Sequence, residues 1–169
     1  MPDAVAVASN RFQEKLGAPS SGAATKVVDH LNDYVRQFIA HAPFVVMATA
    51  NADGQCDASP KGGHPGFVKV LDDRHLLLPD VRGNRLFQSY ENIDANAQVG
   101  LVFFIPGIDY TARVNGTAQV VDEADLQQRG ISVEVFDPDE NAALLQGLLV
   151  EVQQAYPHCT RALKFSRLW

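Results

Sequence analysis

Cysteines and long apolar runs are both scarce in this sequence of 169 residues. The two cysteines, Cys56 and Cys159, stand far apart and fit neither a disulfide framework nor the spacing of a metal site. Such a pair is typical of free thiols in a reducing compartment. No apolar stretch reaches the roughly 18 residues of a membrane helix, and the N-terminal residues lack the pattern of a secretory signal. We therefore expect a cytoplasmic protein with no membrane partner.

Positive charge is also in short supply. The chain has 14 Lys and Arg against 20 Asp and Glu, which gives a formal net charge of −6. Proteins that bind nucleic acid usually present a basic face, so no nucleic-acid partner is expected. An anionic ligand would have to be held by a local cluster of Lys and Arg, because the net charge of the protein repels it.

Motifs of the common nucleotide and metal sites are absent. The chain has no G-x-x-x-x-G-K-[ST], no G-x-G-x-x-G after a strand, no H-E-x-x-H and no C-x-x-C. Its five histidines show no ligand spacing, so no metal site is expected. The spacing assigns no Ser-His-Asp triad either, and catalytic residues stay unassigned.

The length favours one domain. Residues 1–22 are small and polar and predict a flexible N-terminal arm, which leaves a single domain over 23–169. Apolar spacing predicts helices at 25–41 and 84–96 and a short helix within 157–169. Strands are predicted from β-forming residues and alternation, and the last of them is ambiguous with a helix. They cover 44–50, 55–59, 67–71, 75–78, 99–105, 110–121 and 147–154.

Short antiparallel strands with tight turns favour a mainly β fold, a closed barrel with flanking helices, because closure removes exposed edges. Segments 44–50 and 99–105 are apolar on both faces. A barrel strand with one solvated face should alternate, so both faces of these strands must be covered. One face can fill the barrel, and because helices are few, the other needs a second subunit. The pattern predicts a homodimer.

The sequence LPDVRGNR at 78–85 joins a predicted strand to a predicted helix. Asn84 is a good N-cap, and Arg82 and Arg85 flank it although the positive end of a helix dipole disfavours cations. A bound phosphate would resolve this conflict. The alternative is two solvated arginines, one of them paired with Asp80.

Two further segments carry candidate ligand contacts. The glycine- and proline-rich segment 57–66 includes Ser59, Lys61 and Gly62, and predicts either a loop for close ligand approach or an ordinary hairpin loop. The C-terminal cations either lie near the ligand or stabilise the end of a helix. They are Arg161, Lys164 and Arg167, followed by a terminal Trp169 that is expected to dock.

Six blocks of sequence follow one another in the order PFVVMATANADG, DASPKGGHPGFVKVLDDRHLLLPD, RGNRLFQSYENI, VGLVFFIPG, ARVNGTAQV and HCTRALKFSRLW. Together they resemble one branch of the pyridoxamine 5′-phosphate oxidase-like, FMN-binding split barrels. The resemblance covers about residues 30–121 and 148–169, and residues 1–24 and 123–147 show none.

The resemblance implies a six-stranded antiparallel split barrel and a homodimer with two FMN molecules in clefts at the subunit interface. It implies a flavin-dependent oxidoreductase whose partner is a small-molecule substrate or reductant. The alternative is a non-catalytic module that binds flavin, haem or a deazaflavin. The residues expected to bind the cofactor are Ser59, Lys61, Gly62, Asp80, Arg82, Asn84, Arg85, Arg113, Ser166, Arg167 and Trp169.

Two blocks differ from those of authentic pyridoxamine 5′-phosphate oxidases. The third strand reads HLLLPD where those enzymes have an arginine–leucine–lysine block, and the chain ends in SRLW where they have an arginine motif that grips pyridoxal phosphate. The resemblance therefore does not extend to a vitamin B6 substrate.

Overall fold

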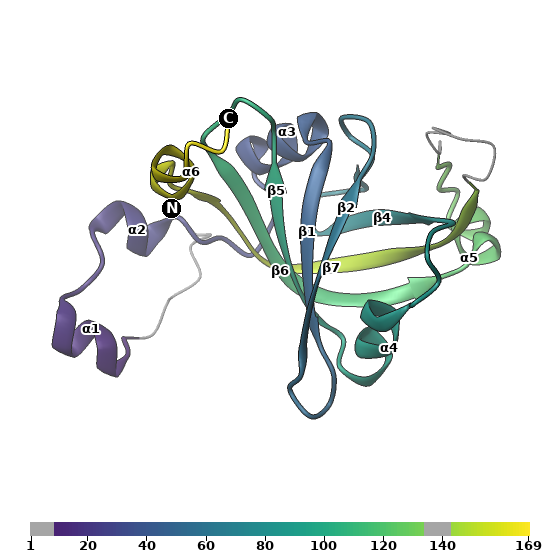
Figure 1. Cartoon of the computed structure of the whole chain (residues 1–169), viewed down its shortest axis with the longest axis horizontal. Coiled ribbons are helices and arrows are strands. Elements are labelled where there is room, and N and C mark those ends of the chain that lie inside the picture. The colour runs from purple at the N-terminus through teal and green to yellow at the C-terminus, as the bar shows by residue number, and fades with distance from the viewer. Residues whose placement is uncertain (1–8, 134–142) are drawn as a thin grey trace.

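A computed structural model describes residues 9–133 and 143–169 of the chain, and Figure 1 shows its elements. Within these residues, seven strands form one antiparallel sheet in the order β2-β1-β5-β6-β7-β4-β3. The strands are β1 (Phe44–Ala50), β2 (Cys56–Gly62), β3 (Lys69–Val70), β4 (His75–Val81), β5 (Gln98–Phe104), β6 (Thr111–Val121) and β7 (Leu144–His158). The mainly β split barrel is confirmed, and the seventh strand is the short β3.

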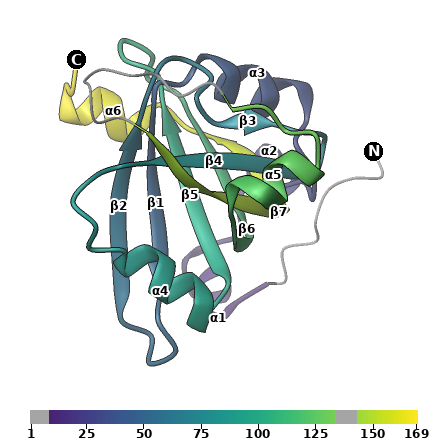
Figure 2. The same cartoon turned by 90° about the vertical axis from the view of Figure 1, so that its right-hand side faces the viewer.

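Six helices flank the sheet in the described residues, and none of them is long and apolar enough to cross a membrane. They are α1 (Arg11–Leu16), α2 (Ser21–Thr25), α3 (Asp33–His41), α4 (Gln88–Ala95), α5 (Glu123–Gln128) and α6 (Arg161–Ser166). Figures 1 and 2 show α3 and α4 against the barrel, whereas α1 lies away from the body. Neither α1 nor α2 has a buried residue.

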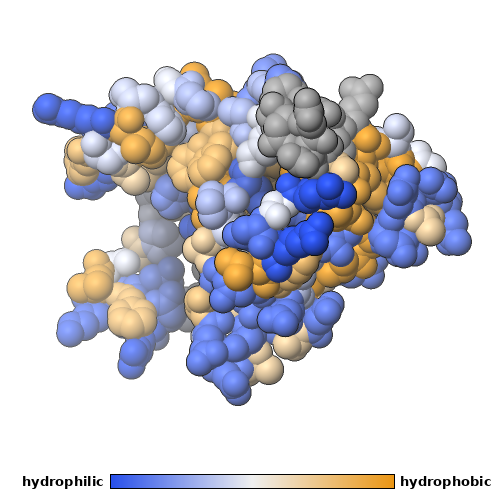
Figure 3. Space-filling model, turned by 45° about the vertical axis from the view of Figure 1, so that its right-hand side comes forward, coloured by the Kyte–Doolittle hydropathy of each residue, from blue (hydrophilic) through white to orange (hydrophobic). Residues whose placement is uncertain are grey.

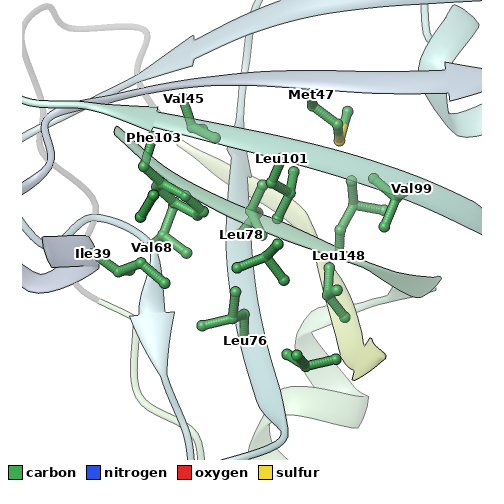
Figure 4. Close-up of a cluster of buried hydrophobic side chains, with 14 of the residues drawn as sticks. Ile39, Val45, Met47, Val68, Leu76, Leu78, Val99, Leu101, Phe103 and Leu148 are labelled. Carbon is green, nitrogen blue, oxygen red and sulfur yellow. The ribbon is translucent and has the colours of Figure 1, made fainter. Parts of the chain in front are cut away.

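One hydrophobic core fills the barrel, and Figure 4 shows side chains from opposite walls pointing toward one another. Leu101 and Phe103 on β5 are fully buried, as are Val45 and Met47 on β1. Leu76 on β4 meets them from the other wall. Burial of aliphatic and aromatic surface on this scale is the main driving force for the fold.

The second face of β1 and β5 is apolar and is only partly covered by the described residues of one chain. Phe44 is 38% exposed, and its ring contacts Phe104 at a centroid distance of 5.9 Å. This outer face consists of Phe44, Val46, Ala48, Gly100, Val102 and Phe104, which pair across the two strands. The sequence pattern therefore located an apolar surface that the barrel interior alone does not bury.

The predicted helix at 25–41 is wrong over its first half. The chain at Val28 forms an isolated bridge with Ala155 of β7, with N–H to O distances of 3.1 and 2.8 Å in the two directions. The helix α3 begins only after Asn32, whose side chain accepts from the Val35 N–H at 3.0 Å. The apolar spacing of this segment fits a helix, but pairing with the sheet satisfies its backbone instead.

Other boundaries shift in smaller ways. The strand predicted at 55–59 runs on to Gly62, so much of the segment expected as a loop is strand. The strand predicted at 67–71 shortens to β3. The segment 147–154 is confirmed as a strand and extends over Leu144–His158, and the C-terminal helix is confirmed as α6. The expected docking of Trp169 is not seen in the single chain, where this residue is 46% exposed.

The long strands β6 and β7 shift register between Asn115 and Gly116. A Cβ at Gly116 would collide with the Glu151 carbonyl oxygen of β7. We predict that Gly116→Ala lowers the free energy of unfolding by about 1–3 kcal/mol, because backbone must move to admit the methyl group. Urea denaturation measures the change. Gly83→Ala is the control, because its Cβ would lie 3.9 Å from the nearest atom, and equal losses in both variants would contradict the prediction.

Candidate functional site

A polar groove of about 480 Å³ lies at the open side of the barrel, between β2 and the end of β4. The loop at 82–87 and the first turn of α4 form its remaining walls. Figure 2 shows α4 and the chain leading from β4 beside β2. A volume between about 300 and 1,000 Å³ is usual for sites that hold a small molecule or a cofactor.

The inward side chains of β2 form one wall of the groove. The register with β1 places Ser59 opposite Met47 and Lys61 opposite Val45. Met47 and Val45 are fully buried. Because strand side chains alternate between faces, Ser59 and Lys61 point to the same side as the core. At this edge of the sheet no further strand covers them, and they line the groove instead.

Lys61 is held in place by a carboxylate and an aromatic ring. Its ammonium lies 3.6 Å from the Asp80 carboxylate of β4 and 5.4 Å from the ring centroid of Tyr90 on α4. Asp80 is only 8% exposed and also hydrogen-bonds the Tyr90 hydroxyl. Burial and the Asp80 charge raise the pKa of Tyr90 well above its usual range.

Hydrogen bonds fix α4 against the strands below it. The Ser89 hydroxyl donates to the Asp57 carboxylate of β2 at 2.6 Å, and the Asn92 amide donates to the Thr49 hydroxyl of β1 at 3.0 Å. Both carboxylates of the groove, Asp57 and Asp80, are therefore already engaged by groups of the protein.

The loop from 82 to 87 differs from its prediction. Asn84 does not cap a helix: its side chain accepts from the Leu86 N–H at 3.1 Å, and α4 begins three residues later than Arg85. Arg85 and Phe87 have φ values of 60° and 52°, in the left-handed region that non-glycine residues rarely adopt. Strained backbone of this kind clusters at ligand-binding sites. The helix dipole therefore does not act on Arg85 as the sequence suggested.

The two arginines of this loop carry unpaired positive charge. Arg82 and Arg85 are both exposed, and neither forms an ion pair in the part of the chain that the structure describes. The alternative in which Asp80 pairs with one of them is wrong, because that carboxylate faces Lys61. Three cations at the rim and wall of one groove favour an anionic ligand, and bidentate guanidinium contacts suit phosphate.

The groove brings together seven of the eleven residues expected at a cofactor site, namely Ser59, Lys61, Gly62, Asp80, Arg82, Asn84 and Arg85. Arg113, Ser166, Arg167 and Trp169 do not line it. Sequence reasoning missed Tyr90 and Asp57. The position of Tyr90 on the apolar face of the predicted helix gave a signal, since a buried hydroxyl needs a partner.

The open-sided antiparallel barrel defines the fold class, a split barrel, and comparison with known proteins gives the family. The model of the pyridoxamine 5′-phosphate oxidase family matches residues 31–159. The chain therefore belongs to this family. Among curated proteins, no relative matches the chain.

Solved structures share the fold at low sequence identity. A candidate pyridoxamine 5′-phosphate oxidase from Lactobacillus delbrueckii is 23% identical, with a TM-score of 0.56, over 78% of this chain and 98% of that one. HupZ of Group A Streptococcus is 18% identical, with a TM-score of 0.53, over 73% and 90% of the two chains. A further candidate oxidase, from Listeria innocua, is 16% identical, with a TM-score of 0.51, over 74% and 95%.

We predict that Asp80→Asn destabilises the ligand-free protein by about 1–3 kcal/mol, because it removes the charge that Lys61 and Tyr90 bond to. Urea denaturation followed by circular dichroism measures the effect. Asp53→Asn, in the exposed turn after β1, is the matched control and should change stability by less than about 0.5 kcal/mol. Indistinguishable midpoints for the two variants would show that Asp80 does not hold the groove together.

Proposed function

We propose that the protein binds FMN in the groove and acts as a flavin-dependent oxidoreductase on a small molecule. The observation that carries the proposal is a pair of guanidiniums, Arg82 and Arg85, that form no ion pair with the described residues. They lie on a loop with left-handed backbone beside the fixed Lys61 ammonium. Membership of the pyridoxamine 5′-phosphate oxidase family supports the same ligand class.

The residues of the groove fit a mononucleotide. Arg82, Asn84 and Arg85 would hold its phosphate, and Ser59 would offer a hydroxyl to polar edges of the ring system. One compact cationic turn suits one phosphate, and the chain has no dinucleotide motif. The proposed ligand is therefore the mononucleotide and not the dinucleotide.

Bound FMN would supply hydride or electron transfer, while the protein supplies binding, orientation and charge. Lys61 keeps its ammonium fixed by Asp80 and Tyr90, so it can offset negative charge that the flavin gains on reduction. The raised pKa of Tyr90 makes its hydroxyl a weaker acid than an ordinary phenol. The redox chemistry would therefore be carried out by the cofactor. If no cellular reductant reduces the bound flavin, the protein is a binding module instead.

We further propose that the functional unit is a homodimer. The apolar outer face of β1 and β5 supports this, because exposed apolar patches of this extent on strands are typical of interfaces. Apolar residues of the termini are exposed as well, among them Phe12 (59%) and Phe165 (73%). Figure 1 shows α1 standing away from the body, and Figure 3 shows a gap between a projecting part of the chain and the body, where a second copy could lie. A dimer is also the arrangement in which Ser166, Arg167 and Trp169 would reach a flavin.

We predict that Arg85→Ala weakens FMN binding about 10- to 100-fold, since a charge-assisted contact to phosphate contributes roughly 1.5–3 kcal/mol. The empty protein should be no less stable, because Arg85 makes no ion pair with the described residues and because alanine meets the same cost as arginine in a left-handed conformation. Quenching of flavin fluorescence on titration of flavin-free protein measures the affinity.

His158→Ala is the control for this titration, because His158 does not line the groove. Its affinity for FMN should stay near that of the unchanged protein. If Arg85→Ala binds FMN as tightly as this control does, the phosphate lies elsewhere and the assignment of the loop is wrong.

We predict that Val102→Asp dissociates the homodimer, because it places a charge at the centre of the apolar outer face, opposite Val46. Gln119→Asp, at an exposed position of β6, should leave the dimer intact. Sedimentation velocity at micromolar concentration distinguishes monomer from dimer. A monomeric unchanged protein would refute the proposed dimer directly, whereas a Val102→Asp dimer would show that another surface forms it.

A further inference from the structure

Three basic side chains gather around one aromatic ring at the ends of β6 and β7. Tyr156 on β7 pairs with Arg113 on β6. The Lys26 ammonium lies 5.4 Å from the Tyr156 ring centroid, and the central carbon of the Arg113 guanidinium lies 5.2 Å from it. His158 follows two residues later on the same face of β7. We call these four residues the cation cluster.

The cation cluster is separate from the groove. Arg113 lies between Ala112 and Val114, which are fully buried, so its side chain is on the outer face of the sheet. Ser59 and Lys61 point to the inner side, and β1 and β5 stand between β2 and β6. The two cationic sites therefore occupy opposite faces and different parts of the barrel.

The backbone holds the cation cluster in a defined arrangement. Lys26 stands two residues before Val28, which is bonded in both directions to Ala155 of β7. All four members of the cluster are partly buried, unlike a set of solvated surface lysines. Figure 1 shows the chain from α2 passing the end of β7, where α6 begins.

No carboxylate balances the cation cluster in the described residues. Other basic side chains have a carboxylate beside them: the Arg74 guanidinium lies 2.9 Å from the Asp29 carboxylate, and a ring nitrogen of His30 lies 3.0 Å from the same carboxylate. Instead, Lys26 and Arg113 act on His158 as like charges. Burial, and with it the positive charges of Lys26 and Arg113, lowers the pKa of His158.

The cation cluster also contains unpartnered polar atoms. Arg113 Nε and His158 Nδ1 are the buried side-chain nitrogen or oxygen atoms without a hydrogen-bond partner in the part of the chain that the structure describes. Buried polar atoms almost always have a partner, and an exception needs an explanation such as an ion or ligand. Two such atoms beside two unpaired cations indicate that a negative group is missing.

We infer that the cation cluster binds the carboxylate or phosphate group of a small-molecule ligand. The guanidinium of Arg113 and the ammonium of Lys26 would donate to its oxygens, and the added negative charge would favour protonation of His158. If the protein has the flavin function proposed above, this anionic group belongs to the substrate. Only this assignment to a substrate rests on the proposed function. The site adjoins the apolar outer face, so the ligand would lie at the edge of the subunit interface.

The test uses the full-length, flavin-free protein and follows its histidine rings by NMR while inorganic phosphate or acetate is added at constant ionic strength. We expect a saturable shift of the His158 resonance and a rise of its pKa with one or both anions. A response to phosphate alone identifies a phosphate group, and a response to acetate identifies a carboxylate. His30 and His75 already face carboxylates and should change little. No response of His158 to either anion would overturn the inference.

Variants locate the anion. Arg113→Gln should weaken the responding anion about 10- to 100-fold, and Lys26→Gln provides the same test should Arg113→Gln fail to fold. Arg74→Gln, a cation paired with Asp29, is the matched control and should leave the response unchanged. A response that Arg85→Ala abolishes, or that survives in both cluster variants, would contradict the inference. Titration with FMN reports on the groove separately, so failure of the groove and failure of the cluster are distinguishable.

Discussion

The ion pair between Lys61 and Asp80 joins two strands that the sheet itself does not connect. β2 is an edge strand, and β4 stands five places along from it, so no backbone hydrogen bond links them. The barrel closes on this side through Lys61, Asp80 and the Tyr90 ring of α4. The same contacts leave the groove open above them, and they consume a carboxylate that could otherwise neutralise the arginines of the loop.

Charge balance explains both candidate sites. A chain with a net charge of −6 has carboxylates to spare, yet Arg82, Arg85, Lys26 and Arg113 have none beside them in the described residues. Unpaired cations in an acidic protein are placed where an external anion can reach them. The groove offers a loop of strained backbone and a fixed ammonium, and the cation cluster offers a histidine whose pKa is lowered by burial and by its cationic neighbours.

Local patterns predicted the strands well because β-forming and apolar residues repeat over 44–50 and 99–105, and because 110–121 alternates. The same patterns gave wrong predictions where one spacing of apolar residues is compatible with two kinds of local structure. Apolar residues at 27, 28 and 31 fit a helix face, yet Val28 pairs with β7. Asn84 bonds to an N–H two residues later, as a cap would, but the chain then turns through left-handed conformations before α4 begins.

The contacts that build the sites are long-range and could not be read from spacing. Lys61 and Asp80 were both named as candidates, but nothing in the sequence indicates that they pair across the open side of the barrel. Likewise, Lys26 and His158 are far apart along the chain and meet only through β7. Residue types therefore nominate side chains for a site, and the topology of the sheet determines which of them lie together.

The account depends most on what the groove holds. Native mass spectrometry of the purified protein, followed by identification of the ligand released on unfolding, tests this directly. The account predicts a dimer that carries FMN, or that takes up one FMN per chain when the mononucleotide is added. A flavin dinucleotide or haem as the released ligand, or a protein that takes up no FMN, would contradict it.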